Sequence, residues 1–333
     1  MYFGVIMIRQ MKYLIFALTF IFPFATQAEI SNELIYNLKA TIVKVRSVNQ
    51  SGGKNLGTGV VVAENQVATN CHVIADAVGI DIHAMGEGYQ PVGLQADWKH
   101  DICILNFQYL PLKPAKLGDS EKLRYEDAVF SIGFPGGAPK PLTTFGSIKA
   151  LYSIDDSQII RISTSFQLGA SGSPVFNEVG EVIALSTFKS PGRRNAFYYT
   201  VPIKWVKEAI QLPVGDLNQI HQHAFWEAEV DKQPYWMQIV IPFQNEDWDS
   251  VNQVVTKWLS DHPNDQEARF YKGIILKNSG HASEAKNILK NILVENPYHA
   301  AALKELADIA GSENNLAEAE YYKNQIAKLV HEY

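Results

Sequence analysis

Short runs of apolar and β-branched residues, separated by turn residues, fill the chain from residue 39 to about residue 201. Glycine- and proline-rich stretches fall between these runs and favour turns. Many short runs at this spacing predict an all-β barrel or sandwich. We expect strands at residues 40–45, 59–62, 79–83, 102–105, 128–132, 159–162, 182–185 and 197–201.

The apolar period changes directly after Pro202. Apolar residues then recur at helical spacing, which predicts one short helix that closes the β region. From residue 246 to the end of the chain the period is helical throughout. The sequence therefore predicts a β region followed by an α region.

A 34-residue repeat organises residues 246–333. Pro263 and Pro297 lie 34 residues apart, and small residues recur at the same interval, Gly273 with Ala307 and Ala285 with Ala319. Small side chains let the two helices of a unit approach closely, and the proline ends the second helix. This pattern is typical of tetratricopeptide (TPR) repeats. We expect TPR-like helical repeats here, after a linker or degenerate helical segment at residues 213–245; an ordinary helical appendage with coincidental spacing is the alternative.

The first 28 residues carry the pattern of a secretory signal peptide. A basic residue precedes an apolar run of about twelve residues, and small residues lead to Ala28. The run is shorter than the roughly 20 residues of a membrane-spanning helix, and Pro23 interrupts it. We expect cleavage near Ala28 and Glu29, a periplasmic or secreted chain with no stable membrane span afterwards, and a start at Met1 or Met11.

Composition narrows the class of protein. The 333 residues are 47% hydrophobic and 19% charged, which excludes disordered and fibrous classes and suggests two domains. The net charge is -6 and no basic run is present, so a nucleic-acid partner is not expected. Cys71 and Cys103 are the only cysteines in the sequence, too few for a disulfide scaffold or a four-cysteine zinc site.

Three polar residues beside predicted strands can be combined into one catalytic site. His72 ends an apolar run, Asp101 opens another, and Ser171 lies in the glycine-rich segment 169–174. A serine hydroxyl needs a base to take its proton, and the base needs a carboxylate to orient it. We predict His72 as the base, Asp101 as the carboxylate and Ser171 as the nucleophile, with no metal or cofactor.

The glycine-rich segment also predicts an oxyanion hole, because Gly169 allows a turn that points its own amide and that of Ser171 in one direction. Taken singly, a histidine, an aspartate or a serine of this kind is more often a turn or surface residue. The hypothesis of a catalytic site rests on the order of His72, Asp101 and Ser171 in the chain. α/β-Hydrolases run Ser, Asp, His and subtilisins run Asp, His, Ser, so only the chymotrypsin order fits this chain.

The three segments resemble the signature blocks of trypsin-like serine proteases, specifically the bacterial HtrA/Deg-like branch. The resemblance covers about residues 38–210. It implies a multidomain chain in which a chymotrypsin-like, all-β protease domain at residues 29–212, with two six-stranded barrels, precedes the all-α repeats. The segments that carry the resemblance are 57–61, 68–73, 101–105, 145–150, 169–174 and 199–203.

The sequence departs from this branch in two ways. The branch has Ser-Gly-Gly-Pro after the nucleophile, whereas this chain has Ser173 at the second glycine, which predicts a side chain at the floor of the cleft. The branch also carries a peptide-binding PDZ domain after the protease, and here helical repeats take its place. Regulation through a PDZ domain therefore does not transfer.

The resemblance also implies where the substrate pocket lies. Its base would be near Ser165 and Phe166, and one wall would be Ser186, Thr187 and Phe188. No acidic residue stands at the base, so a preference for Lys or Arg is not supported. We expect a neutral, small-to-medium substrate side chain.

The two cysteines flank the predicted catalytic pair. If His72 and Asp101 are in contact, Cys71 and Cys103 must be neighbours, and in an oxidising compartment a disulfide between them is expected. Two unbridged buried thiols are the alternative. A Cys-His protease is disfavoured because Cys71 adjoins its own supposed base.

The sequence thus favours an exported serine endopeptidase that cleaves protein or peptide substrates through an acyl-enzyme at Ser171. The repeats would bind a protein partner or substrate, or would only pack on the protease. The alternative function is a catalytically silent, protease-like binding or adaptor protein.

Overall fold

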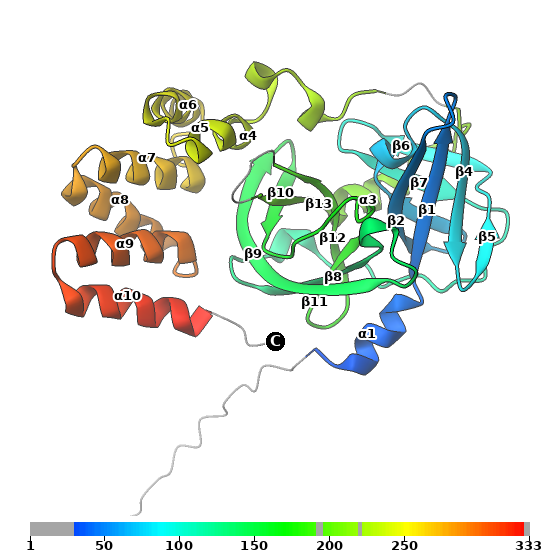
Figure 1. Ribbon diagram of the computed structural model, residues 1–333, viewed down its shortest axis with the longest axis horizontal. Helices are drawn as coiled ribbons and strands as arrows, with labels where there is room; N and C mark the ends of the chain where they lie inside the picture. The colour runs from blue at the N-terminus through cyan, green and yellow to red at the C-terminus, as the bar shows by residue number, and fades with distance from the viewer. Residues whose placement is uncertain (1–29, 191–195, 219–221, 330–333) are drawn as a thin grey trace, which may run out of the picture.

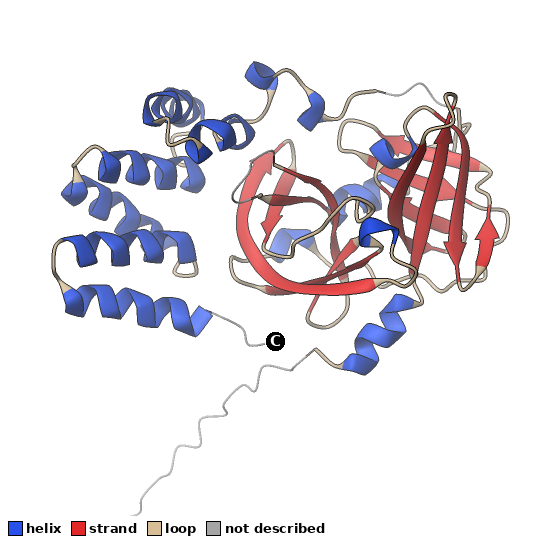
Figure 2. Cartoon of the chain, in the orientation of Figure 1, coloured by secondary structure: helices blue, strands red, loops and turns tan. Residues whose placement is uncertain are grey.

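The computed structural model describes residues 30–190, 196–218 and 222–329 (Figure 1). The predicted signal peptide lies outside these residues. Strands dominate the chain up to residue 202 and helices follow (Figure 2). The predicted order of a β region and then an α region is confirmed.

Antiparallel strands form the N-terminal sheet in the order β5-β4-β1-β2-β3-β7-β6. This sheet has seven strands rather than the six expected, because β4 turns back into the edge strand β5. Met85 and Gly86, both at positive φ, make the two-residue turn between them, as tight hairpins require. The elements are α1 (Asn32–Lys39), β1 (Ile42–Asn49), β2 (Lys54–Ala63), β3 (Gln66–Thr69), α2 (Cys71–Ile74), β4 (Ala77–Ala84), β5 (Glu87–Tyr89), β6 (Gly93–Asp97) and β7 (Ile102–Asn106).

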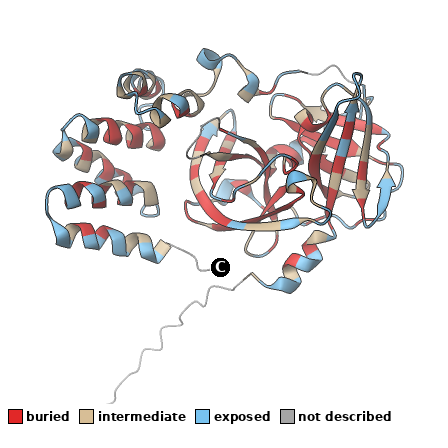
Figure 3. Ribbon diagram, in the orientation of Figure 1, coloured by how far each residue is buried: buried red, intermediate tan, exposed pale blue. Residues whose placement is uncertain are grey.

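The second sheet is a closed, six-stranded barrel in the order β10-β13-β12-β11-β8-β9. The buried positions follow its strands, and β8 is buried along its whole length (Figure 3). The elements are η1 (Ser120–Lys122), β8 (Ala128–Gly133), η2 (Pro135–Gly137), β9 (Leu142–Ile154), β10 (Ser157–Ile162), β11 (Pro174–Asn177), β12 (Val182–Lys189), β13 (Tyr198–Pro202) and the closing helix α3 (Ile203–Ala209).

Each strand predicted from the sequence overlaps a strand of the structure. The predicted ranges omitted β3, β5, β6, β9 and β11. The sequences of β5 and β6, Glu-Gly-Tyr and Gly-Leu-Gln-Ala-Asp, contain no β-branched residue. Both are strands because a neighbouring strand supplies their hydrogen-bonding partners.

The helical region keeps the 34-residue interval of the sequence. Helices α6, α8 and α10 each have 14 residues and begin at residues 248, 282 and 316, while α7 and α9 begin at residues 266 and 300. Gly273 lies against Leu289, so a side chain at residue 273 would crowd this helix pair. The elements are η3 (Phe225–Glu227), η4 (Val230–Lys232), α4 (Tyr235–Gln238), α5 (Val240–Gln244), α6 (Trp248–Asp261), α7 (Gln266–Asn278), α8 (Ala282–Glu295), α9 (Ala300–Ser312) and α10 (Leu316–Leu329).

The helices pack directly on the C-terminal barrel, beside which they lie in Figure 1. Tyr125 donates a hydrogen bond to Glu267 Oε1 at 2.7 Å, and His299 Nε2 lies 3.3 Å from the same oxygen. Both Glu267 and His299 are buried. Trp236 of α4 stacks on Tyr152 of β9 with ring centroids 4.9 Å apart. The barrel and the helices therefore share one apolar core.

In the part of the chain that the structure describes, no helix combines the length and the apolar character needed to cross a membrane.

Candidate active site

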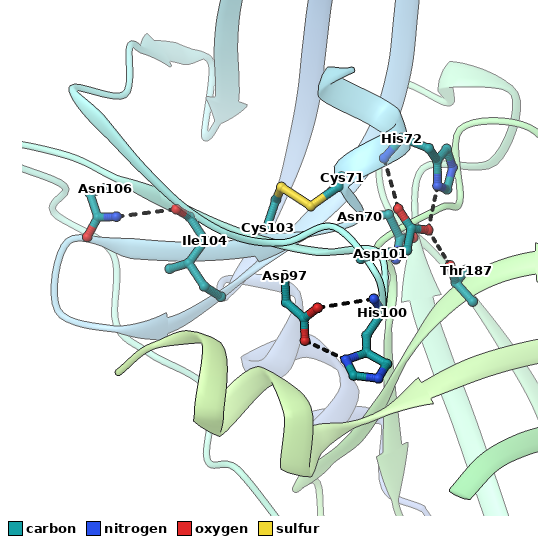
Figure 4. Close-up of a disulfide and its surroundings, with 10 residues drawn as sticks. All are labelled: Asn70, Cys71, His72, Asp97, His100, Asp101, Cys103, Ile104, Asn106 and Thr187. Atoms are coloured by element: carbon teal, nitrogen blue, oxygen red, sulfur yellow. Dashed lines mark hydrogen bonds and ion pairs between the residues drawn. A yellow bond between two sulfur atoms is a disulfide. The ribbon is translucent and has the colours of Figure 1, made fainter. Parts of the chain in front are cut away.

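His72 and Asp101 face each other at the edge of the N-terminal sheet (Figure 4). His72 lies in the short helix α2 directly after β3, and Asp101 lies in the turn between β6 and β7. The imidazole Nδ1 is 2.6 Å from Asp101 Oδ2, and the His72 amide donates to Oδ1 at 2.9 Å. One carboxylate thus binds both the backbone and the ring of His72, which fixes the ring orientation.

The backbone of Asp101 has an unusual conformation, with φ at +60°. Aspartate tolerates this left-handed region better than most residues. Its carbonyl oxygen accepts hydrogen bonds from the Asn70 side chain at 3.0 Å and from the Cys71 amide at 3.3 Å. These bonds hold the turn so that the carboxylate, which is 1% exposed, points at His72.

The pKa of His72 is raised above its usual value. Burial opposes the charged imidazolium and works to lower the pKa, but the charge of Asp101 and its hydrogen bond outweigh burial, and Glu227 adds a further attraction. The site therefore favours a proton on His72, as a base that forms an imidazolium during a reaction requires.

Thr187 connects Asp101 to the loop that carries Ser171. Its hydroxyl donates to Asp101 Oδ2 at 2.6 Å, and its carbonyl oxygen accepts from Ser171 Oγ at 3.4 Å. Sequence reasoning placed Thr187 only in the wall of the substrate pocket. A buried hydroxyl beside a buried carboxylate could have been anticipated only from the fold, because the two residues are 86 positions apart.

Ser171 lies in a tight loop between β10 and β11. Gly169 and Gly172 both have positive φ, and a Cβ at residue 169 would lie 2.7 Å from the carbonyl oxygen of Phe134. Thr58 of β2 anchors the loop, since its hydroxyl donates to Gly169 O at 2.9 Å and its amide donates to Ser171 O at 2.8 Å. The N-terminal sheet thus holds the loop that carries Ser171.

Ser171 and His72 lie on adjacent segments but are not hydrogen-bonded to each other. The carbonyl oxygen of Ser171 and the side chain of Val73 both border Gly57. Among the described residues, the hydroxyl of Ser171 bonds only to Thr187. The structure therefore joins His72 to Asp101 directly, and joins Ser171 to Asp101 through Thr187.

The two amides predicted to form an oxyanion hole are unpaired. Ala170, Gly172 and Ser173 each donate their amide to a backbone carbonyl. Within the described ranges, the amides of Gly169 and Ser171 have no acceptor. Unpaired amides beside a serine hydroxyl are the donors that a developing oxyanion requires.

The prediction for Ser173 is wrong: its side chain does not reach the floor of the cleft. Ser173 is 1% exposed, and its Oγ lies beside Gly133 of β8, where a Cβ would be 1.9 Å from it. The absence of a side chain at residue 133 makes the room for the hydroxyl below the cleft.

The residues predicted for the substrate pocket occupy different environments. Ser186 is fully buried, and its amide and carbonyl bond to Ser173 and Gly172 of the loop that carries Ser171. Phe166 contacts Tyr198 with ring centroids 5.0 Å apart, and Ser165 before it is exposed. Phe188 stacks on Tyr199 at 4.9 Å.

Cys71 and Cys103 form a disulfide, with their Cα atoms 4.9 Å apart (Figure 4). The bridge ties the start of α2 to β7, directly behind the His72–Asp101 pair. This is the pairing that the sequence predicted, and the described chain has no free cysteine.

Two residues of the segment after the C-terminal barrel also reach the site, and sequence reasoning missed both. The indole of Trp226 contacts the His72 ring edge-on, with centroids 5.5 Å apart, and Glu227 raises the pKa of His72. Their sequence neighbourhood shows no catalytic pattern, so no signal in the sequence could have found them. Among the described residues, no cluster of three or more His, Cys, Asp or Glu side chains could hold a metal ion.

A hydrogen-bonded His-Asp pair beside a serine loop with unpaired amides defines a serine-peptidase type of site. Residues 57–185 match the family described as Trypsin-like peptidase domain. Residues 57–185 of this chain are therefore similar to a trypsin-like peptidase domain, in agreement with the resemblance to the HtrA branch.

Two relatives match parts of this chain. A protein named "Probable periplasmic serine endoprotease DegP-like" from Pseudomonas putida is 31% identical over 165 residues, which cover 47% of this chain and 35% of that protein. The anti-sigma-I factor RsgI9 of Acetivibrio thermocellus is 27% identical over 227 residues, which cover 66% of this chain and 31% of that protein. This chain thus spans about a third of the length of each.

Among solved structures, the active form of the Rv3671c protease from M. tuberculosis superimposes with a TM-score of 0.51 at 21% identity. The match covers 59% of this chain and 89% of that chain. At this identity the likeness shows the fold alone, and it confirms the chymotrypsin-like β fold that the sequence predicted.

Proposed function

We propose that this protein is an exported serine endopeptidase that hydrolyses peptide bonds through an acyl-enzyme at Ser171. The observation that carries the proposal is the short bond between His72 Nδ1 and Asp101 Oδ2, beside a serine loop whose two central amides are unpaired. This combination provides an oriented base, a nucleophile and oxyanion donors in one place.

The reaction begins with a rotation of the Ser171 side chain. Its hydrogen bond to Thr187 O is long, at 3.4 Å, so little is lost when the hydroxyl turns toward His72. His72 holds its proton on Nδ1 for Asp101, which leaves Nε2 as the acceptor. The Ser171 proton passes to Nε2 as Oγ attacks the substrate carbonyl carbon.

The remaining steps use the same groups. The amides of Gly169 and Ser171 bind the carbonyl oxygen as it becomes negative. The imidazolium of His72 gives its proton to the leaving amine, and the peptide C–N bond breaks. Water then attacks the acyl-enzyme with His72 again as the base, which releases the second product and restores Ser171.

The substrates we propose are proteins or peptides in the periplasm or outside the cell. Two observations support the compartment: the signal-peptide pattern of residues 1–28, and the similarity to the periplasmic DegP-like relative from Pseudomonas putida. For the helical region we propose TPR-like repeats that present a surface to a protein partner or substrate; the equal 34-residue spacing of α6, α8 and α10 supports this.

The alternative is a silent, protease-like adaptor, and one contact favours it: Ser171 Oγ bonds to Thr187 rather than to His72. Labelling with a fluorophosphonate probe decides between the two. Wild-type protein is expected to label, whereas Ser171→Ala is expected not to label and His72→Ala only weakly. If the folded wild-type protein resists the probe as completely as Ser171→Ala does, the adaptor function replaces the proposal.

A further inference from the structure

The segment that contains η3 returns to the active site after the chain has left the barrel. The amide of Phe225 donates to the carbonyl of Lys99 at 3.0 Å, two residues before Asp101. Ala224 is buried, and its amide donates to the Glu227 side chain at 2.9 Å. These bonds fix the segment against the turn that carries Asp101, so its position beside the site is set by the structure.

Trp226 is the residue of this segment whose ring contacts the His72 ring. Its ring meets the His72 ring at 5.5 Å in an edge-on geometry of 89°. The same ring stacks on Phe188 at 5.6 Å with an interplanar angle of 22°. Phe188 directly follows Thr187, whose carbonyl lies 3.4 Å from Ser171 Oγ. The indole therefore contacts both the His72 ring and the residue that follows Thr187.

The indole also holds an unused hydrogen-bond donor. Trp226 Nε1 is buried and has no acceptor among the described residues. A buried indole N–H normally finds a partner, and leaving it unpaired costs free energy. A small rotation of the indole would turn this donor toward a backbone carbonyl of a bound peptide.

The segment borders the site without closing it. The His72 side chain remains 27% exposed, and Ser171 is also partly exposed. A segment that blocked the site would bury both residues. Trp226 is therefore placed as a wall beside an open site.

We propose that Trp226 is a specificity-determining residue: it forms an apolar wall of the substrate groove and selects peptides with an apolar side chain next to the residue that is attacked. The proposal rests on the proposed peptidase function for the identity of the ligand. The substrate class is a peptide with Leu or Phe, rather than Asp or Gly, at that position, and the indole N–H donates to its backbone.

Binding to the Ser171→Ala protein tests this without any need for hydrolysis. Fluorescein-labelled alanine hexapeptides, with Leu, Phe, Gly or Asp placed at each position in turn, are titrated by fluorescence polarisation. Ser171→Ala is expected to prefer Leu and Phe over Asp by about tenfold at one position, because tenfold corresponds to about 1.4 kcal/mol and tryptophan is enriched among residues that contribute this much to binding. Adding Trp226→Ala is expected to reduce that preference to within about threefold.

Two further variants isolate the cause. Trp226→Phe keeps an aromatic wall but lacks the donor, so the preference is expected to survive while all the peptides bind more weakly. Val230→Ala removes an exposed apolar side chain of the same segment, 67% exposed, and is expected to change nothing.

The inference is wrong if Ser171→Ala shows no preference at any position, or if Trp226→Ala leaves the preference intact. It is also wrong if Trp226→Ala changes the affinity for every peptide by the same factor. A uniform increase in affinity would show that the segment covers the site, and a uniform decrease would show that Trp226 only supports the structure of the site. Fluorophosphonate labelling of Ser171 is read separately, so loss of the peptidase proposal is distinguishable from loss of this one.

Discussion

His100 Nε2 lies 2.9 Å from Asp155 Oδ2, and this contact joins the two β domains one residue before Asp101. His100 belongs to the turn between β6 and β7, and Asp155 to the hairpin between β9 and β10. The other ring nitrogen of His100 is 2.5 Å from Asp97, a contact visible in Figure 4, and Trp205 stacks on the ring at 3.8 Å. The His100 ring, between two carboxylates, thus joins the domains beside the His72–Asp101 pair.

This contact predicts a stability that depends on pH. Burial lowers the pKa of His100, but the hydrogen bonds to Asp97 and Asp155 outweigh it, so the pKa is raised in the folded protein. A histidine whose pKa is raised on folding stabilises the folded protein fully at pH values below its unfolded pKa of about 6.5. This contribution to the free energy of unfolding disappears as the pH rises through the folded pKa. His100→Gln should lower the free energy of unfolding by about 1 kcal/mol near pH 6 and by less near pH 9. Urea unfolding at both pH values measures this; a difference that stays constant with pH would contradict it.

The hydroxyl of Thr187 should matter for turnover. Thr187→Val leaves the buried Asp101 carboxylate without one donor, and an unsatisfied buried acceptor costs about 1–3 kcal/mol. We expect kcat/KM to fall about tenfold or more, while Thr187→Ser, which keeps the hydroxyl, stays near wild type. Equal losses in the two variants would show that the methyl group, and not the hydrogen bond, is responsible.

Glu227 should set part of the pH profile. The base must be neutral, so kcat/KM declines as pH falls through the pKa of His72, which Asp101 and Glu227 raise against the effect of burial. Glu227→Gln removes one attraction, so the acidic limb should move to lower pH and activity near pH 6 should rise. Glu229→Gln removes a charge that pairs with Lys232, and it serves as the matched control with an unchanged limb. If the acidic limb of Glu227→Gln stays at the wild-type pH, Glu227 does not influence the pKa of His72.

The disulfide should carry a large share of the domain's stability. It closes a loop between residues 32 positions apart, for which the chain-entropy argument gives about 3–4 kcal/mol. The double variant Cys71→Ala with Cys103→Ala should therefore unfold at a much lower urea concentration than the wild type. Thiol titration of denatured, unreduced protein should detect no free sulfhydryl, and the detection of two would contradict the bridge.

The sequence predicted those residues of the site that a local pattern of apolar and polar positions identifies. His72, Asp101 and Ser171 each adjoin an apolar strand, and their order in the chain matches one arrangement of such groups. The orientation of Ser173 could not be predicted, because it depends on the room left by Gly133, a residue 40 positions earlier.

The contacts that cross between domains were also beyond prediction. Trp226 reaches His72 from a segment with no catalytic pattern, and Glu267 is an ordinary charged residue of a helix in the sequence. It is buried where the barrel and helices meet, with Tyr125 donating to its Oε1 and His299 beside the same oxygen.

The Glu267 cluster has a consequence for how the protein unfolds. Since the barrel contributes Tyr125 and the helices contribute Glu267 and His299, pulling the two regions apart would break the Tyr125–Glu267 hydrogen bond and expose the shared apolar core to water. Separation is thus unfavourable, and the protease and the repeats should denature cooperatively in one transition. A chain that ends before α6 should then contain a destabilised barrel that does not function independently of the helices.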